Sequence, residues 1–255
     1  MAPICADLAE EQAALDAMVA ELTETQWATP TAAQGWDVRD TIVHLVQADQ
    51  AGYLAVADPD AFGAAKIEVA RGGLDAFGSG RGRSGADTLQ WWRQTRAQML
   101  AAFAPLATKD RIPWFGPSMS ALSFATARLM ETWSHGQDVA AALGQNVAAT
   151  DRLRHVAHIG VTTRGWSYAN RARTVPDAVV RVELEAPSGA TWGWGPEDAE
   201  QRVTGSAQDF CLVVTQRRAL SATALQTQGE AAREWMELAQ AFAGPPTVTD
   251  TTRSH

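Results

Sequence analysis

The sequence predicts an α+β protein in which a helical bundle is followed by a small α/β domain. In the first two-thirds of the 255 residues, apolar side chains recur at the three- and four-residue spacing of amphipathic helices. The pattern changes at Thr174-Val175-Pro176, after which short β-branched runs alternate with turn residues. We therefore place a helical domain at residues 1–172 and an α/β domain at 173–245, and we expect 246–255 to be a disordered tail.

The first two predicted helices span residues 7–24 and 37–55. Asp37 follows the loop Gln34-Gly35-Trp36, and with Asp40 three residues later it forms a weak capping box. Residues 58–85 are rich in glycine and arginine, so we expect a flexible surface loop, with a mobile flap over a site as the alternative. An RNA-binding role for this loop is disfavoured by the acidic charge of the chain.

A third helix is predicted at residues 87–107. The prolines and glycine between residues 111 and 117 exclude a continuous helix there. Ser118 or Ser120 then caps a fourth helix that ends near Gly144, and a fifth helix follows at 151–170.

The α/β domain is predicted from shorter patterns. Strands are expected at residues 179–184, 191–195, 201–204 and 220–228, and helices at 206–216 and 229–242.

Composition excludes several classes of partner. A net charge of −8 and a pI of about 5.1 make nucleic acids and anionic membranes unsuitable partners. No apolar run has the length of a membrane span, and residues 1–10 do not resemble a signal peptide, so we expect a cytoplasmic protein. Cys5 and Cys211 are far apart and are interpreted as buried free thiols.

Glu131 and His135 are the strongest candidate ligands for a metal ion. They lie four residues apart on the fourth helix, so their side chains share one face. His44, on an apolar helix, is a third candidate ligand, and Asp138 could orient His135. The alternatives are a surface Glu–His pair, a core histidine and a solvated acid at the helix end.

Other candidate side chains have simpler interpretations. His155 and His158 lie one turn apart, but ordinary helix positions explain them as well as a ligand role does. Trp36, Trp114 and Trp133 could form the walls of a pocket, although core packing is the more common role of buried aromatic residues.

The segments around these residues resemble the mycothiol-dependent maleylpyruvate isomerase family of DinB-like metalloproteins. The matching runs are residues 35–40, His44-Leu45 and 127–138, together with 203–210 and Gln216-Arg217. The resemblance implies an up-and-down four-helix bundle that holds a divalent metal, with zinc expected, through His44, Glu131 and His135. It also implies a C-terminal domain similar to sterol carrier proteins, in which Arg217 or its neighbour Arg218 faces the active site.

The same resemblance implies an enzyme that uses mycothiol or a similar small thiol. The metal would favour the thiolate, which attacks a small electrophile bearing a carboxylate, and Arg217 would hold that carboxylate. Isomerisation and S-transfer both remain open, because residues 112–117 and the Gly/Arg loop indicate a separate subgroup. The alternatives are a metal-dependent hydrolase of thiol conjugates, a non-catalytic metal or small-ligand binder, and a purely structural helical protein. We expect an actinobacterial source and a monomer or homodimer.

Overall fold

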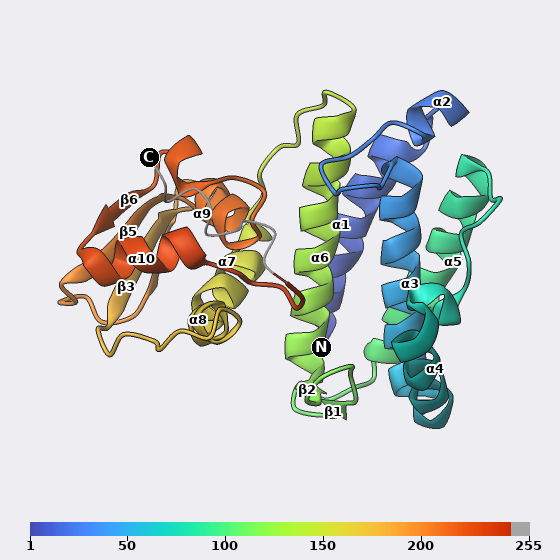
Figure 1. The fold of residues 1–255 in the computed structure, drawn as a ribbon, viewed down its shortest axis with the longest axis horizontal. Helices are drawn as coiled ribbons and strands as arrows, with labels where there is room; N and C mark the ends of the chain where they lie inside the picture. Colours follow the sequence, from blue (N-terminus) through green and yellow to red (C-terminus); the bar gives the residue numbers. More distant parts are fainter. Residues whose placement is uncertain (246–255) are drawn as a thin grey trace. The chain divides into compact units, whose positions relative to one another are not determined.

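The computed structural model describes residues 1–245, which divide into two compact units, Met1–Val147 and a second unit that begins at Ala148 (Figure 1). The prediction of a mixed α+β fold is confirmed. The sequence placed the domain boundary at 172/173, whereas the second unit already begins with the helices after Ala148. The predicted tail, 246–255, lies outside the described residues.

The first unit is built on four long helices, α1 (Ala2–Val19), α3 (Val38–Ala57), α5 (Gly85–Phe103) and α6 (Ala121–Ala142). Helix α3 packs against α5, and α1 packs against α6. Helices α3 and α5 run in the same direction, since Asp49 contacts Trp92 and Gly52, further along α3, lies next to Met99, so the predicted up-and-down order does not hold for this pair. Apolar side chains from all four helices and from the short α2 (Glu24–Trp27) form a buried core, which includes Leu15, Val19, Trp27, Ile42, Leu45, Val46, Leu89, Trp92 and Val139.

Side-chain caps fix where the ligand-bearing helices begin. The capping box predicted at Asp37 and Asp40 is present, with the Asp40 amide donating to Asp37 Oδ1 at 2.8 Å and the Asp37 amide to Asp40 Oδ2 at 3.2 Å. Ser120, one of the two predicted caps of α6, accepts from the Ser123 amide at 3.1 Å. Gly144 follows the end of α6 with φ +65°, a conformation that suits glycine.

The prediction of a loop at residues 58–85 is wrong for the first half of this segment. Pro59–Gly72 forms helix α4, and Leu74–Phe77 forms the 3₁₀ turn η1. Asp58 caps α4 by accepting from the Ala61 amide at 3.0 Å, and Phe62 anchors the helix in an aromatic cluster. The periodicity was too weak to reveal α4, because Phe62 is its one buried large apolar side chain.

Residues 111–117 are irregular, as predicted from their prolines. Short strands β1 (Arg111–Ile112) and β2 (Met119–Ser120) pair antiparallel around this run.

The second unit contains a four-stranded sheet in the order β4-β3-β5-β6. Strands β3 (Val180–Glu185) and β5 (Gln201–Ser206) pair in parallel, while β4 (Thr191–Trp194) and β6 (Gln226–Gln228) add antiparallel edges. Helices α9 (Ala207–Val214) and α10 (Glu230–Leu238) pack on β5. The predicted strand over 220–228 is shorter than expected, since Leu220–Ala222 forms the 3₁₀ turn η2.

The predicted fifth helix is broken in two, α7 (Leu153–Thr162) and α8 (Arg164–Ala169). Thr163 leaves the helical conformation, and its hydroxyl donates to the Ile159 carbonyl at 2.7 Å. Helix α7 packs against α9, and Ser167 of α8 accepts from the Gln240 amide at 2.9 Å. These contacts explain why residues 148–172 group with the sheet rather than with the bundle.

Two further sequence features have a place in the fold. Cys5 and Cys211 are free thiols. Cys211 is buried, and its desolvation raises its pKa, whereas Cys5 is only half-buried, contrary to the prediction. Among residues 1–245, none of the helices combines the length and the apolar character that a membrane crossing requires.

Candidate metal centre

The structure brings His44, Glu131 and His135 together within the first unit. One ligand atom from each residue lies within 4.8 Å of the others, although His44 belongs to α3 and the other two to α6. Glu131 Oε2 lies 3.5 Å from His135 Nε2, and the two imidazole centroids are 5.0 Å apart. Two helices remote in sequence thus converge on one point, as the predicted site requires.

Asp138 orients His135 from the next turn of α6. Its Oδ2 lies 3.0 Å from His135 Nδ1, and the two side chains are 8% and 10% exposed. A carboxylate at Nδ1 favours the tautomer with hydrogen on that nitrogen, which leaves the Nε2 lone pair facing Glu131. The arrangement corresponds to the carboxylate–histidine pair that supports many metal-binding imidazoles.

Glu131 is held as a carboxylate. Burial alone would raise its pKa, but the hydrogen bond to His135 and the positive charges of His135, Arg128 and His44 outweigh this effect and lower the pKa to about 2. That hydrogen bond and the positive charge of the imidazoles belong to the metal-free protein with His135 and His44 protonated. In the tautomer with a free Nε2 lone pair, a bound cation would take over the same role. Glu131 is therefore available as an anionic oxygen ligand at neutral pH.

Trp36 covers one side of the two imidazoles. Its ring centroid lies 5.0 Å from that of His44 and 6.1 Å from that of His135, and its side chain is half-buried. The backbone of Trp36 is fixed, since its N–H donates to the Ala33 carbonyl at 3.0 Å and its carbonyl accepts from the Thr31 amide at 2.9 Å. Of the three tryptophans considered from the sequence, Trp36 flanks the candidate ligands.

The other two tryptophans contribute to packing. Trp114 stacks on Phe62, with centroids 5.8 Å apart and planes 3° from parallel, and meets Phe124 edge-on. Trp133 is buried, with 5% of its surface exposed. Trp133 thus has the core role that the sequence favoured, whereas Trp114 is half-buried and packs in an aromatic cluster.

Sequence reasoning missed a buried polar network one turn from the ligands. Asp49 of α3 accepts from Arg128 Nε of α6 at 3.0 Å and from Trp92 Nε1 of α5 at 3.2 Å, and Gln12 Nε2 of α1 lies 3.5 Å from it. Burial raises the pKa of Asp49, an effect that the Arg128 guanidinium opposes. The sequence did contain a signal for this network, because Asp49 and Arg128 are charged residues at inward-facing positions of two apolar helices.

The histidines of α7 belong to the second unit. His158 is exposed and His155 is half-buried, at ordinary helix positions.

Arg217 and Arg218 also lie in the second unit, just after α9. Arg217 is half-buried, with Nη1 donating to the Thr215 carbonyl at 2.8 Å. Arg218 is more exposed and lies 3.5 Å from Asp209 Oδ1. The role predicted for Arg217 against a substrate stays a prediction.

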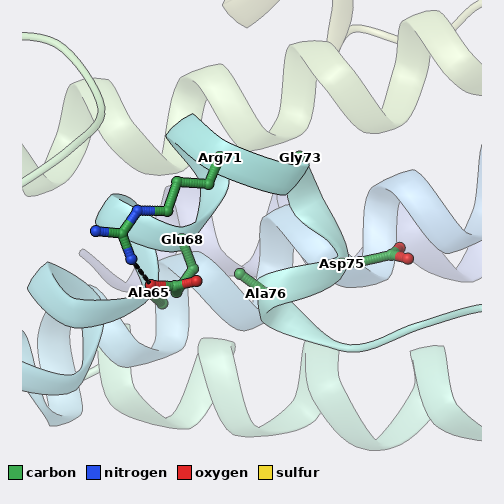
Figure 2. Close-up of a pocket in the computed structure, with 6 residues that line it drawn as sticks. All are labelled: Ala65, Glu68, Arg71, Gly73, Asp75 and Ala76. Atoms are coloured by element: carbon green, nitrogen blue, oxygen red, sulfur yellow. Dashed lines mark hydrogen bonds and ion pairs between the residues drawn. The ribbon is translucent and has the colours of Figure 1, made fainter.

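Figure 2 shows a separate, shallow pocket between α4 and η1. Glu68 and Arg71 form an exposed ion pair of 2.7 Å on its wall. Its lining residues are Ala65, Glu68, Arg71, Gly73, Asp75 and Ala76, none of which belongs to the ligand cluster. With mostly exposed walls and this one solvated pair, the pocket offers little to hold a ligand.

Comparison with known proteins relates both units to described families. The family described as mycothiol maleylpyruvate isomerase N-terminal domain matches residues 8–140, about half of the chain. The family described as wyosine base formation matches residues 176–227. Two uncharacterized proteins of Mycobacterium tuberculosis, from strains CDC 1551 and H37Rv, are each 48% identical over 248 residues, which cover 96% of this chain and 96% of the relative.

Solved structures agree with the family match. The crystal structure of the mycothiol-dependent maleylpyruvate isomerase shares the fold with a TM-score of 0.58 at 13% identity, over 88% of this chain and 91% of that chain. A histidine-to-alanine mutant of that enzyme gives a TM-score of 0.54 at 14% identity, over the same shares. With the half-chain family match and the shared fold together, this chain belongs to the mycothiol maleylpyruvate isomerase family.

Proposed function

We propose that this protein is a divalent-metal-dependent enzyme that uses mycothiol or a similar small thiol to isomerise, or to transfer sulfur to, a small electrophilic substrate. The observation that carries the proposal is the convergence of His44, Glu131 and His135 from two helices, with ligand atoms within 4.8 Å of one another. Membership of the family supports the dependence on a thiol.

The three side chains fit a divalent ion, with zinc the best candidate. Ligands of a tetrahedral zinc ion lie about 2.1 Å from the metal and hence roughly 3.4 Å from one another, close to the 3.5 Å between Glu131 and His135. Three protein ligands leave one position open, which is typical of catalytic rather than structural zinc. The carboxylates of Glu131 and Asp138 would balance the two positive charges, while Asp49 is already neutralised by Arg128.

An ion in this site would act as a Lewis acid and favour the thiolate form of a bound thiol. The protein's own residues would do the rest. Asp138 holds the His135 ring in one orientation, and Glu131 supplies the anionic ligand. Trp36 shields the imidazoles on one side and so limits the directions from which thiol and substrate approach.

Arg217 is the proposed carboxylate-binding residue. A guanidinium binds a carboxylate through two parallel N–H donors, which fixes the orientation of a small acid. An Arg217→Ala variant should then raise KM for a carboxylate substrate far more than it changes the affinity for thiol. Arg218→Ala, which removes the more exposed neighbour, tests the alternative assignment. A rise in KM in this variant instead of in Arg217→Ala would assign the role to Arg218.

Metal analysis tests the ligand assignment directly. Wild type purified with zinc should contain one equivalent, and His44→Ala, Glu131→Ala and His135→Ala should each lose most of it. His158→Ala removes an exposed histidine of the second unit and should keep the wild-type content. Unchanged stoichiometry in all three site variants would refute the assignment.

Thiol dependence needs a separate measurement. Metal-loaded protein would be incubated with electrophilic carboxylic acids, with and without mycothiol, and the products identified by mass spectrometry. A rearranged substrate indicates isomerisation, a stable adduct indicates S-transfer, and cleavage of a supplied thiol conjugate indicates the hydrolase alternative. Tight binding of metal and thiol without turnover of any electrophile would instead support a non-catalytic binding protein.

A further inference from the structure

The buried ion pair between Asp49 and Arg128 joins the two helices that carry the candidate ligands. Arg128 Nε donates to Asp49 Oδ1 at 3.0 Å, and Arg128 Nη2 lies 2.9 Å from the same oxygen. The side chains of Asp49 and Arg128 are 1% and 4% exposed. Burying two charges is costly, and such pairs often add little net stability. The ion pair therefore directs attention to a role in specifying how the two helices pack.

Asp49 is linked to all three other long helices of the bundle. Besides Arg128 of α6, it accepts from Trp92 of α5 at 3.2 Å and from Gln12 of α1 at 3.5 Å. The donors are directional, so a sliding or rotation of α3 would break several of these bonds at once. Apolar contacts lack this directionality and tolerate small shifts.

The position of the ion pair matches the spacing of the ligands. Along α3, Asp49 lies five residues after His44, or about 7.5 Å at 1.5 Å per residue. Along α6, Arg128 lies three residues before Glu131 and seven before His135, or about 4.5 and 10.5 Å. The two helices run antiparallel, so the ion pair forms the contact next to the ligand cluster.

A third contact lies further along the same interface between α3 and α6. Gly52, one turn beyond Asp49, lies against Phe124, one turn before Arg128, so closely that a Cβ on Gly52 would come within 3.1 Å of the Phe124 ring. The ligand cluster, the ion pair and this glycine–aromatic contact therefore share one helix–helix register.

We propose that Asp49 and Arg128 are positioning residues, whose buried pairing fixes the α3–α6 register and so brings His44 within bonding distance of the metal held by Glu131 and His135. The inference rests on the proposed metal site. Neither residue contacts the candidate metal position as a ligand. Arg128 also contributes positive charge near Glu131, so the band positions of bound Co²⁺, which report ligand geometry, are the readout that tests the placement of the helix that carries His44.

The chain provides a matched control pair. Asp16 of α1 is bound by Arg93 and Arg96 of α5, with Asp16–Arg93 at 2.7 Å and side chains 11% and 43% exposed. This cluster has the same chemistry but joins helices that carry no candidate ligand. Replacing Asp49 and Arg128 by Leu and Met (D49L/R128M), or Asp16 and Arg93 likewise (D16L/R93M), leaves the net charge unchanged.

The experiment is a titration of metal-free protein with Co²⁺, followed through the visible absorption of the ion. We expect D49L/R128M to bind Co²⁺ about 10- to 100-fold more weakly than wild type, with shifted bands that report altered ligand geometry. The control D16L/R93M should keep the wild-type affinity within about 2-fold, because it leaves the contacts of Arg96 with Gln12 and Trp92 in place. Unfolding by urea, measured on the metal-free variants, separates lost stability from lost affinity.

Wild-type affinity and spectrum in folded D49L/R128M would overturn the proposal, and so would equal loss in the control. If D49L/R128M does not fold, Arg128→Lys serves in its place, because it keeps the charge but loses the fork that reaches Asp49. This variant should weaken Co²⁺ binding several-fold, and unchanged binding would again overturn the proposal. Failure of wild type to bind Co²⁺ would refute the metal site itself, which is a different result.

Discussion

Asp138 provides the sharpest test of how the site is organised, because it supports a ligand without being one. We predict that Asp138→Ala weakens zinc binding while the protein stays folded. The side chain pairs with His135 Nδ1 at 3.0 Å, and both groups are largely buried, at 8% and 10% exposure. The loss therefore falls on a well-shielded, charge-assisted bond.

The size of the effect follows from the bond that is lost. A hydrogen bond to a charged group contributes about 1.5–3 kcal/mol. At about 1.4 kcal/mol for each tenfold change in affinity, the dissociation constant should rise roughly 10- to 150-fold. Removal of an outer-shell carboxylate from metal-binding histidines costs about 10- to 100-fold in other proteins, which agrees with this range.

The assay is competition for zinc with a chromophoric chelator at pH 7.5. Asp60→Ala is the control, since it removes the same charge from an exposed position on α4. It should bind zinc as tightly as wild type. Equal affinities of Asp138→Ala and wild type would show that Asp138 does not hold His135 for the metal, and the tautomer argument would be wrong.

Three further predictions test the surroundings of the site and the packing of each unit. Trp36→Phe should abolish most of the fluorescence quenching that Co²⁺ causes in wild type, because the Trp36 ring lies 5.0 Å from His44; Trp166→Phe, in the second unit, should leave it unchanged, and the reverse result would place the ion elsewhere. Hydrogen bonding from Arg93 is the main cause that lowers the pKa of Asp16 in the folded state. The stabilisation from the Asp16 carboxylate is therefore fully present above about pH 4, and it is lost as the pH falls through the lower pKa of the folded state. Asp16→Asn should accordingly cost about 2 kcal/mol in urea unfolding at pH 7 and less at pH 3, whereas a constant difference would contradict the linkage. Gly160→Ala should destabilise the protein by about 1–3 kcal/mol, since the new Cβ would lie 2.7 Å from Val214 Cγ2; Gly165→Ala, where nothing lies within 4 Å, should be neutral or stabilising in the same thermal melt.

The sequence by itself determined the long helices, the class of the fold and the identity of the candidate ligands. Local rules are sufficient for these features. Asp37 and Asp40 mark a helix start through side-chain bonds to nearby amides, and the spacing of Glu131 and His135 places them on one face whatever surrounds the helix. The sequence did not predict α4 or the helix break at Thr163. Helix α4 depends on one anchoring phenylalanine, and the break depends on contacts with segments distant in sequence.

Only the tertiary structure decided that His44 meets Glu131 and His135, and that Asp49 meets Arg128 beside them. Those distances depend on the axial register and rotation of two helices remote in sequence, and no periodicity within one helix encodes either quantity. The structure likewise chose Trp36 over Trp114 and Trp133 as the residue beside the imidazoles, because a loop fixed by backbone hydrogen bonds carries it there. The residue types thus specify which ligand side chains each helix carries, and the packing of the helices specifies which of these side chains meet.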